Sequence, residues 1–554
     1  MSLPHFPLPL ARAGGFPATI GLVKNVDADA RRASVPDALE RAGGLAPGVA
    51  RRVARETGVA EAEVHGVASF YELLARPDAK LRVCTGLSCR LAGADALLEA
   101  ARSAGLPVAE ASCLAACDVA PAMLRDRDVV PAVSVDDVRR AAPDWTQLRS
   151  AAAPDDQPWQ GAIGPREADP ERLVFDLAGD LDRSGDALAR ARALGPDAVL
   201  DALEESGLQG RGGAAFPAHI KWRAMGSQPP GPRYVVLNAD ESEPGTFKDR
   251  ELLVRRPDRV LEGLAIAAQT VGALDVWLYL RGEFGLPRRV LQAELEDAER
   301  SGRFGALRFH LHSGQGAYVC GEETALFESL EGRRGLPRHR PPLPVERGLW
   351  GRPTLIHNVE TIASVPAILT RGAAWFRALG RTGPGTKLYC VSGCVHRPGT
   401  YELPLGVSLD ELLDAAGGCT GALRAFSPGG AASGFLPASE RTRPLDFAAL
   451  AEAGSMLGSA GVVVLDDRAD LRDAVRDQLR FFEAESCGQC APCRIGTHYL
   501  REALDRQGRG AADALAHVAD VAWQMSEGSI CGLGQTAALP LTSALEHFPE
   551  EFSS

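Results

Sequence analysis

Several features are missing from this 554-residue sequence. It contains no run of 18 consecutive apolar residues, and lysine and arginine form no dense block. Residues 1–10 carry three prolines and no basic stretch. We therefore expect neither a secretory signal nor direct membrane insertion, and a cytoplasmic location.

Basic residues are also fewer than acidic ones. The formal net charge is −12, from 60 basic and 72 acidic residues, so we expect no nucleic-acid partner. Only five of the basic residues are lysine. This scarcity is typical of a GC-rich genome, and we attach no function to it.

The composition that remains is that of a soluble globular protein. Apolar residues make up 45% and charged residues 24% of the chain. At about 150 residues per domain, the length predicts three to four domains.

The 12 cysteines carry the first specific signal. In a reducing cytoplasm we do not expect them to form disulfides. Eight of them fall into two tight sets. We expect the other four to be buried small residues and not ligands; they are Cys320, Cys390, Cys394 and Cys419.

The first set is Cys84-x4-Cys89 followed by Cys113-x3-Cys117. Two close pairs of thiolates can converge on one metal centre, since each short loop lets two sulfurs face the same point. Strand and helix patterns around the set predict a small α/β unit with its cysteines on loops. The spacing favours a 2Fe-2S cluster. Zinc is the alternative, although zinc sites usually show two C-x2-C pairs.

The second set is Cys487-x2-Cys490-x2-Cys493, with Cys531 after 37 intervening residues. Three closely spaced thiolates fit three irons of a 4Fe-4S cubane, and a distant fourth cysteine closes the site. Zinc is again the alternative. Helical patterns on both sides predict that this cluster lies at the end of a helical bundle.

A glycine-rich segment lies between the two sets. Residues 210–217 read Gly-Arg-Gly-Gly-Ala-Ala-Phe-Pro. Glycines let the backbone approach a phosphate closely, and a helix that follows would point its N–H groups at the anion. A helical pattern over residues 198–206 precedes the segment, whereas a Rossmann fingerprint requires a strand. We therefore predict a phosphate or flavin loop of another type.

Three predicted strands follow this segment, at residues 234–237, 276–280 and 308–312. The first leads into an amide and three carboxylates at 238–245, and the third leads into a glycine- and glutamate-rich loop at 314–324. In open α/β sheets such strand ends form the usual ligand site. Taken singly, each loop could be a solvated turn, but their number favours one shared site.

These segments together resemble a known family, the NADH-oxidising flavoprotein (51 kDa-type) subunit of respiratory complex I. The first four-cysteine unit, with residues 64–71 before it, resembles the 24 kDa-type thioredoxin-like 2Fe-2S subunit. Here the two are joined in one chain, and the resemblance extends from about residue 30 to about residue 540. The segments that carry the flavoprotein resemblance are 210–222, 238–245, 316–326, 357–361 and 485–496.

The resemblance implies FMN, NAD(H), one 2Fe-2S cluster and one 4Fe-4S cluster as cofactors. It also implies that Phe216 stacks on the adenine and that Glu243 and Glu323 lie near the nicotinamide and flavin, with no residue assigned as a certain proton donor. The residues that would hold flavin and nucleotide are Gly210, Arg211, Gly212, Gly213, Phe216, Lys221, Asn238, Asp240, Glu241, Tyr318, Gly321, Glu322, Arg340, Asn358 and Thr361.

Four positions depart from the family pattern. Ala224 and Leu343 stand where the family often has aromatic residues, and Arg340 stands where it commonly has lysine. Ala215 replaces a usual glycine, and a methyl group is tolerated there if φ is negative.

We therefore predict a multidomain α/β and α+β protein. It should combine a thioredoxin-like ferredoxin domain, a Rossmann-like FMN domain, a ubiquitin-like (SLBB) module and a C-terminal helical bundle. The predicted boundaries are 1–75 for a helical lead-in, 76–142 for the ferredoxin domain, 143–172 for a linker, 173–385 for the FMN and NAD(H) domain, 386–455 for the module and 456–554 for the bundle.

The cofactors predict the chemistry. NADH gives two electrons as a hydride, whereas iron–sulfur clusters accept one at a time, so FMN must lie between nucleotide and cubane. The sequence carries no recognisable quinone, molybdenum or nickel site. We therefore expect a hetero-oligomer in which a catalytic partner subunit carries further iron–sulfur clusters.

Within the family that the chain resembles, fused versions occur in NAD-linked molybdenum or tungsten formate dehydrogenases and in NAD-reducing hydrogenases. The hydrogenase chain often has an incomplete first cysteine set. The complete set here favours the β (diaphorase) subunit of formate dehydrogenase, which would reduce NAD+ with electrons from formate. The alternatives are a hydrogenase diaphorase, a complex I subunit, and a non-catalytic iron–sulfur or NADH-sensing scaffold.

Overall fold

The computed structural model describes residues 26–142, 144–151, 163–164, 170–179, 186–511 and 513–553. The N-terminal segment considered as a secretory signal and most of the predicted linker, 143–172, lie outside the described residues. In the part of the chain that is described, no helix is both long and apolar enough to cross a membrane.

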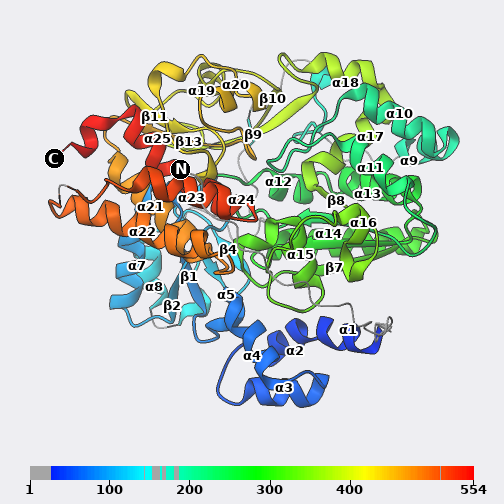
Figure 1. The fold of residues 1–554 in the computed structure, drawn as a ribbon, viewed down its shortest axis with the longest axis horizontal. Coiled ribbons are helices and arrows are strands. Elements are labelled where there is room, and N and C mark those ends of the chain that lie inside the picture. Colours follow the sequence, from blue (N-terminus) through cyan, green and yellow to red (C-terminus); the bar gives the residue numbers. More distant parts are fainter. Residues whose placement is uncertain are drawn as a thin grey trace, which may run out of the picture.

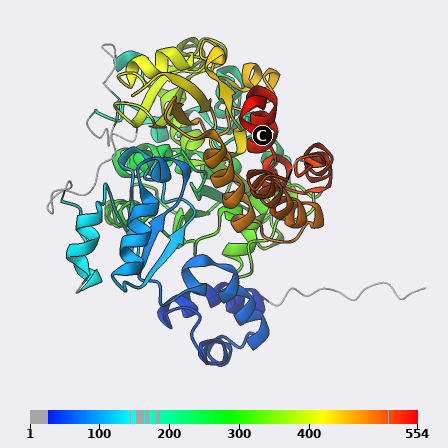
Figure 2. The same ribbon diagram turned by 90° about the vertical axis from the view of Figure 1, so that its left-hand side faces the viewer.

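The chain begins with a group of helices that lies below the rest of the molecule in Figures 1 and 2. Its apolar side chains share a core with the flavin-domain sheet, through Val236 and Tyr279. The Tyr71 hydroxyl donates to the Arg333 carbonyl at 2.6 Å. The helices are α1 (Val26–Ala33), α2 (Val35–Arg41), α3 (Val49–Thr57), α4 (Glu61–Phe70) and α5 (Glu72–Ala75).

The next unit is the predicted small α/β domain. Its four-stranded sheet has the order β2-β1-β3-β4, with β1 and β2 parallel and the other pairs antiparallel. Helices α6 (Leu87–Leu91), α7 (Ala94–Ser103) and α8 (Val135–Ala141) pack around it. The strands are β1 (Leu81–Cys84), β2 (Val108–Ala111), β3 (Met123–Arg125) and β4 (Asp128–Val130).

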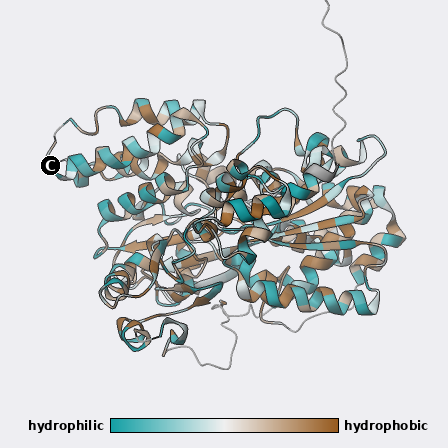
Figure 3. Cartoon of the chain, turned by 90° about the horizontal axis from the view of Figure 1, so that it is seen from below, coloured by the Kyte–Doolittle hydropathy of each residue, from teal (hydrophilic) through white to brown (hydrophobic). Residues whose placement is uncertain are grey.

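The central domain contains a four-stranded parallel sheet in the order β7-β6-β5-β8. Strands β5 and β6 are largely apolar, and the helices of the molecule carry teal, hydrophilic stretches on their outer faces in Figure 3. The strands are β5 (Tyr234–Ala239), β6 (Asp275–Leu280), β7 (Arg308–Ser313) and β8 (Thr354–Asn358). The helices of this domain include α10 (Pro196–Ser206), α11 (Ala218–Gly226), α12 (Lys248–Arg255), α13 (Pro257–Val271), α14 (Gly285–Ser301), α15 (Glu323–Leu330), α17 (Val359–Arg371) and α18 (Ala373–Leu379).

A five-stranded mixed sheet follows, in the order β10-β9-β13-β11-β12. Its helix α19 (Leu409–Ala415) begins with the predicted capping box of Ser408 and Glu411. The strands are β9 (Thr386–Gly393), β10 (Gly399–Pro404), β11 (Leu423–Ser427), β12 (Leu436–Pro437) and β13 (Gly461–Asp466).

Strand β13 corrects a predicted boundary. Residues 456–554 were all predicted to belong to the helical bundle, but β13 pairs with both β9 and β11 and is buried along its whole length. The run Gly-Val-Val-Val-Leu-Asp is therefore the central strand of the module's sheet. The bundle begins after it, and its helices are α21 (Leu471–Glu485), α22 (Ala491–Gly508), α23 (Val518–Gly528), α24 (Gly532–Thr536) and α25 (Leu539–His547).

A buried ion pair joins the module to the flavin domain. The ammonium of Lys387, on β9, lies 2.6 Å from the carboxylate of Glu360, on α17, and neither side chain is exposed. The same carboxylate accepts the backbone N–H of Leu388 at 3.0 Å. Burial lowers the pKa of Lys387 to about 8, although Glu360 favours its charged form.

We predict that Lys387→Met lowers the free energy of unfolding by about 3–5 kcal/mol at pH 7, because the buried carboxylate of Glu360 loses a cationic partner. Arg381→Met is the matched control. Arg381 joins the same two domains by pairing with Glu411, but both side chains are about half exposed, so we expect a loss of about 1 kcal/mol or less. Urea denaturation of the loaded chain measures both values, and equal losses would contradict the prediction.

Candidate functional site

The carboxyl ends of the parallel strands bring the predicted flavin residues together. Asn238, at the end of β5, lies opposite Asn358, at the end of β8. The Asn238 amide donates to the carbonyl of Gly321 at 2.7 Å, which ties the β5 loop to the loop after β7. The site geometry expected for an open α/β sheet is thus present.

The glycine-rich loop lies between α10 and α11, so the prediction of a helix and not a strand before it is confirmed. The Gly210 N–H donates to the Phe216 carbonyl at 2.9 Å, which closes the loop on itself. A Cβ on Gly212 would lie 2.9 Å from the Cβ of Asn358, whereas Gly213 has φ +137° and open space on its side-chain face. The loop therefore needs glycine both for close packing and for backbone conformation.

The condition for an unstrained methyl group at Ala215 is not met. Its φ is +53°, in the left-handed region, and not negative. A glycine at this position would adopt that conformation without strain, whereas the methyl group costs energy that the surrounding loop must offset. The residue pattern does not indicate this conformation, because the closure of the loop imposes it.

Polar contacts fix the loop against α17 and against the segment that follows α18. The Arg211 N–H donates to the hydroxyl of Thr361 at 2.8 Å. The guanidinium of Arg211 is 1% exposed and donates to the Pro384 carbonyl at 2.6 Å. Asn358 caps α17 by accepting the Glu360 N–H at 3.0 Å. These residues support the loop backbone, and a direct contact of Arg211 and Thr361 with the flavin stays a prediction.

The acidic loop after β5 contains carboxylates with different surroundings. Glu241 accepts the N–H groups of Asp249 and Arg250 at 2.8 and 2.9 Å, at the first turn of α12. Burial raises the pKa of Glu241 to about 8 and that of Asp240 also to about 8. In this structure Glu241 therefore anchors a helix, a role that was not predicted from the sequence.

Glu243 is held between two domains. Its carboxylate accepts the Tyr318 hydroxyl at 2.5 Å and the Ala432 N–H at 2.9 Å. Burial raises its pKa to about 7, although both hydrogen bonds favour the ionised form. The carboxylate is thus fixed in position beside the loop after β7.

A second group of charges lies at the start of α15. Lys221 pairs with Glu323 at 2.8 Å, and Arg340 pairs with Glu323 at 3.0 Å and also with Glu322. Glu322 caps α15 through the Thr324 N–H at 2.9 Å. Arg340 is one of the positions that depart from the family pattern. The loop that carries it is therefore bound to the start of α15, where the predicted site residues Glu322 and Glu323 lie.

The residues predicted to bind the nucleotide lie partly in contact with solvent. Phe216 and Leu343 are 46% and 47% exposed, which is unusual for large apolar side chains. Ala224 packs against the core of the flavin domain. An exposed ring at the edge of a phosphate-type loop is available for stacking, which is the role that the resemblance implies for Phe216.

The rare lysines gather near this site, a clustering that was not predicted from the sequence. Three of the five lie there: Lys221, Lys248 and Lys387. Lys248 is fully buried and contacts Asp249 at 2.6 Å and the side-chain oxygen of Asn358 at 3.3 Å. The scarcity of lysine could have indicated these positions. In a chain that otherwise uses arginine, a lysine marks a position where a guanidinium does not replace the compact ammonium.

The first cysteine set converges in the small α/β domain. Strands β1 and β2 are parallel neighbours, with Cys84 opposite Ala111, so both ligand loops leave from the same sheet edge. Cys84, Cys89, Cys113 and Cys117 are all buried. The pKa of the Cys113 thiol lies well below its ordinary value, because Cys117 and Cys84 hydrogen-bond to it. The four thiols are thus close enough to share one centre.

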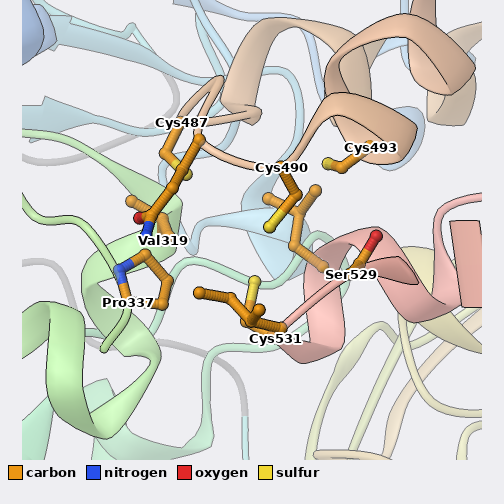
Figure 4. A pocket seen from close by; sticks show the side chains of 10 residues that line it. Val319, Pro337, Cys487, Cys490, Cys493, Ser529 and Cys531 are labelled. Carbon is orange, nitrogen blue, oxygen red and sulfur yellow. The ribbon is translucent and has the colours of Figure 1, made fainter. Parts of the chain in front are cut away.

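The four cysteines of the second set line one shared pocket. Figure 4 shows Cys487, Cys490 and Cys493 on one side of this space and Cys531 on the other. Helices α22 and α23 span the long interval in sequence and return Cys531 to the others. Burial raises the pKa of Cys531 to about 11, so metal binding would have to release its proton.

Both sets fit iron–sulfur clusters. Among the residues that the structure describes, no three His, Cys, Asp or Glu side chains gather tightly enough to hold a single metal ion. A cluster distributes its ligands over several irons, so its sulfurs need not meet at one point. Each set offers four thiols, which is the number of ligands that a 2Fe-2S or a 4Fe-4S cluster takes.

The four remaining cysteines divide into two kinds. Cys320 and Cys390 are buried, as predicted. Cys394 and Cys419 are partly exposed, so that part of the prediction was wrong. They lie at the edge of the module's sheet, where Val395 and Cys419 form an isolated bridge.

Comparison with known proteins identifies the same four regions. Family models match a thioredoxin-like [2Fe-2S] ferredoxin over residues 34–145, the Nuo51 FMN-binding domain over 203–367, an SLBB domain over 388–435, and the NADH-ubiquinone oxidoreductase-F iron-sulfur binding region over 473–554. The predicted fold class and the FMN, 2Fe-2S and 4Fe-4S domains are thereby confirmed.

Curated relatives are named as subunits of NADH-quinone oxidoreductase. The relative in Rhizobium meliloti (strain 1021) is 43% identical over 393 residues, which are 68% of this chain and 93% of the relative. The relative in Mycobacterium tuberculosis (H37Rv) is 43% identical over 390 residues, covering 67% of this chain and 88% of the relative.

A similar solved structure includes both halves of the chain. It is a NAD+-reducing [NiFe]-hydrogenase in the H2-reduced state, with a TM-score of 0.86, 34% identity, and coverage of 94% of this chain and 93% of that chain. The same enzyme type in the air-oxidized state gives a TM-score of 0.82. The chain therefore belongs to the family of these NADH-quinone oxidoreductase subunits, with a thioredoxin-like [2Fe-2S] ferredoxin domain joined to the Nuo51 FMN-binding domain.

Proposed function

We propose that the chain is a diaphorase-type subunit that passes electrons between NAD(H), FMN and a 4Fe-4S cluster. One observation carries this proposal: the cavity of the second cysteine set shares a wall with the predicted flavin site. Val319 and Pro337 line that cavity, and Val319 follows Tyr318 directly (Figure 4). The Tyr318 N–H also donates to Glu485 at 2.9 Å, two residues before Cys487.

The flavin would be held by the glycine loop and by the charges around it. The backbone of residues 210–213 offers a close approach to an anion, and Lys221 adds positive charge at the start of α11. Asn238 and Asn358 supply amides at the sheet edge. When bound, FMN supplies the exchange between a two-electron hydride and single electrons.

The chain's own residues would orient the nicotinamide and exclude water. Glu243 and Tyr318 hold one another at 2.5 Å, and Glu323 is held by Lys221, so these carboxylates are fixed before a substrate arrives. Phe216 offers an exposed ring for the adenine. Hydride transfer needs stacking and positioning more than a strong acid, so we assign no proton donor.

The electron partner that we favour is a molybdenum or tungsten formate dehydrogenase subunit. The support is the complete first cysteine set, whose four thiols are buried and close together. A hydrogenase partner is the second candidate, and the similarity to the NAD+-reducing [NiFe]-hydrogenase over 94% of this chain favours it.

Lys221→Met should weaken FMN binding about ten- to hundredfold, because a charge-assisted hydrogen bond contributes about 1.5–3 kcal/mol. Lys80→Met is the control, since Lys80 is an exposed lysine in the ferredoxin domain. Quenching of FMN fluorescence by the flavin-depleted chain gives both affinities. Equal affinities for the two variants would remove Lys221 from the flavin site.

Iron analysis and dye reduction test the cluster and enzyme assignments together. The loaded chain should contain about six irons, Cys487→Ser should lose about four, and Cys84→Ser should lose about two. Cys419→Ser, which changes a partly exposed cysteine outside both sets, should lose none.

The wild-type chain should reduce an artificial dye with NADH. Its failure to do so, with iron and FMN present, would favour a non-catalytic scaffold.

The native complex decides between the two partners. We expect purified complex to reduce NAD+ with formate and to contain molybdenum or tungsten. Reduction of NAD+ by hydrogen, with nickel in the complex, would replace the formate dehydrogenase assignment by the hydrogenase one.

A further inference from the structure

Arg281 connects the flavin loop to the ligand loop of the first cysteine set. It follows directly after β6, and its backbone N–H donates to the Ala239 carbonyl at 3.1 Å. One guanidinium nitrogen donates to the carbonyl of Glu241 at 2.9 Å, and another donates to the carbonyl of Cys113. A single side chain from the flavin domain thus contacts both cofactor loops.

The guanidinium is shielded from water and charged. Arg281 is 6% exposed, and its Nε donates to Glu283 at 3.1 Å. Burial opposes the charged form, but a guanidinium stays protonated in proteins, and the Glu283 carboxylate beside it favours the charge. The positive charge is therefore present throughout the physiological range of pH.

A second arginine holds the same ligand loop but in a different electrostatic setting. Arg250, on α12, donates to the Ala115 carbonyl and pairs with the Asp118 carboxylate through two nitrogens, at 2.8 and 3.1 Å. Glu251 lies 2.7 Å from the same guanidinium. Two carboxylates thus contact the guanidinium of Arg250 directly, whereas Arg281 pairs directly with Glu283, and Asp240, Glu72 and Glu485 lie near enough to interact with its charge.

The charge of Arg281 lies beside a predicted cluster ligand, because its guanidinium donates to the carbonyl of Cys113 and is shielded from water. Reduction of an iron–sulfur cluster adds one electron and hence one negative charge. A buried cation beside a ligand favours the reduced form, because charges interact strongly where water is excluded.

We propose that Arg281 is a positioning residue that locks the flavin loop to the Cys113 loop and raises the reduction potential of the 2Fe-2S cluster. Glu283 would oppose this effect by partly neutralising the guanidinium. The effect concerns the cluster alone. The proposal can therefore be tested whatever the electron partner is and whether or not the chain reacts with NAD(H).

The test is an EPR-monitored redox titration of the full chain loaded with FMN and both clusters. The variants are Arg281→Met, which removes the charge, Arg281→Lys, which retains charge but loses the forked contacts, and Glu283→Gln, which removes the opposing charge. Arg289→Met is the matched control. Arg289 also joins the flavin domain to the ferredoxin domain, through Asp128 at 2.7 Å, but it is 62% exposed.

We expect Arg281→Met to shift the one-electron reduction equilibrium of the 2Fe-2S cluster about tenfold toward the oxidised form, which is about 59 mV lower in potential. Arg281→Lys should fall between this variant and the wild type. Glu283→Gln should shift the potential upward, and Arg289→Met should leave it unchanged.

Opposite shifts for Arg281→Met and Glu283→Gln distinguish an electrostatic effect from a loosened loop, because loosening would move both in one direction. An unchanged potential in Arg281→Met with two irons retained at the site would overturn the proposal, and so would shifts of the same sign. If Arg281→Met does not assemble the cluster, Glu283→Gln decides, and an unchanged or lowered potential there would overturn the proposal.

Discussion

Buried and half-buried charged and polar groups join the flavin domain to each of its neighbours. Lys387 and Glu360 bind it to the ubiquitin-like module, Arg250 and Asp118 bind it to the ferredoxin domain, and Tyr318 and Glu485 bind it to the helical bundle. Separating a buried pair leaves a charge uncompensated at a cost of several kcal/mol. The cofactor sites therefore keep a fixed relation to one another, and that relation is what an electron-transfer chain requires.

The features that the sequence predicted best are local ones. The spacing of Cys487, Cys490 and Cys493 depends on a single short loop, and the glycine segment at 210–217 depends on one turn between two helices. The strand ends that gather the flavin residues follow from strand patterns and from the geometry of parallel sheets. Each of these predictions could be made without knowing which elements pack together.

The features that were missed depend on packing between distant segments. From the sequence alone, strand β13 was assigned to the start of the bundle. Only its pairing with β9 and β11 shows that it belongs to the module's sheet. The positive φ of Ala215 is imposed by closure of its loop, and Glu241 turns toward α12 because the N–H groups of Asp249 and Arg250 lie there. The low number of lysines was attributed to a GC-rich genome, so no role was predicted for the buried Lys248 and Lys387. Because lysine is rare in this chain, their positions were informative.

The central claim is that this one chain carries electrons between the nucleotide, the flavin and the second cluster. Its most direct test is rapid-freeze EPR after NADH is mixed with the isolated, fully loaded chain in the absence of oxygen. We expect the signal of a reduced 4Fe-4S cluster to appear together with loss of the oxidised flavin absorbance. Loss of flavin absorbance with no reduced cluster, or no reaction of the flavin at all, would contradict the account.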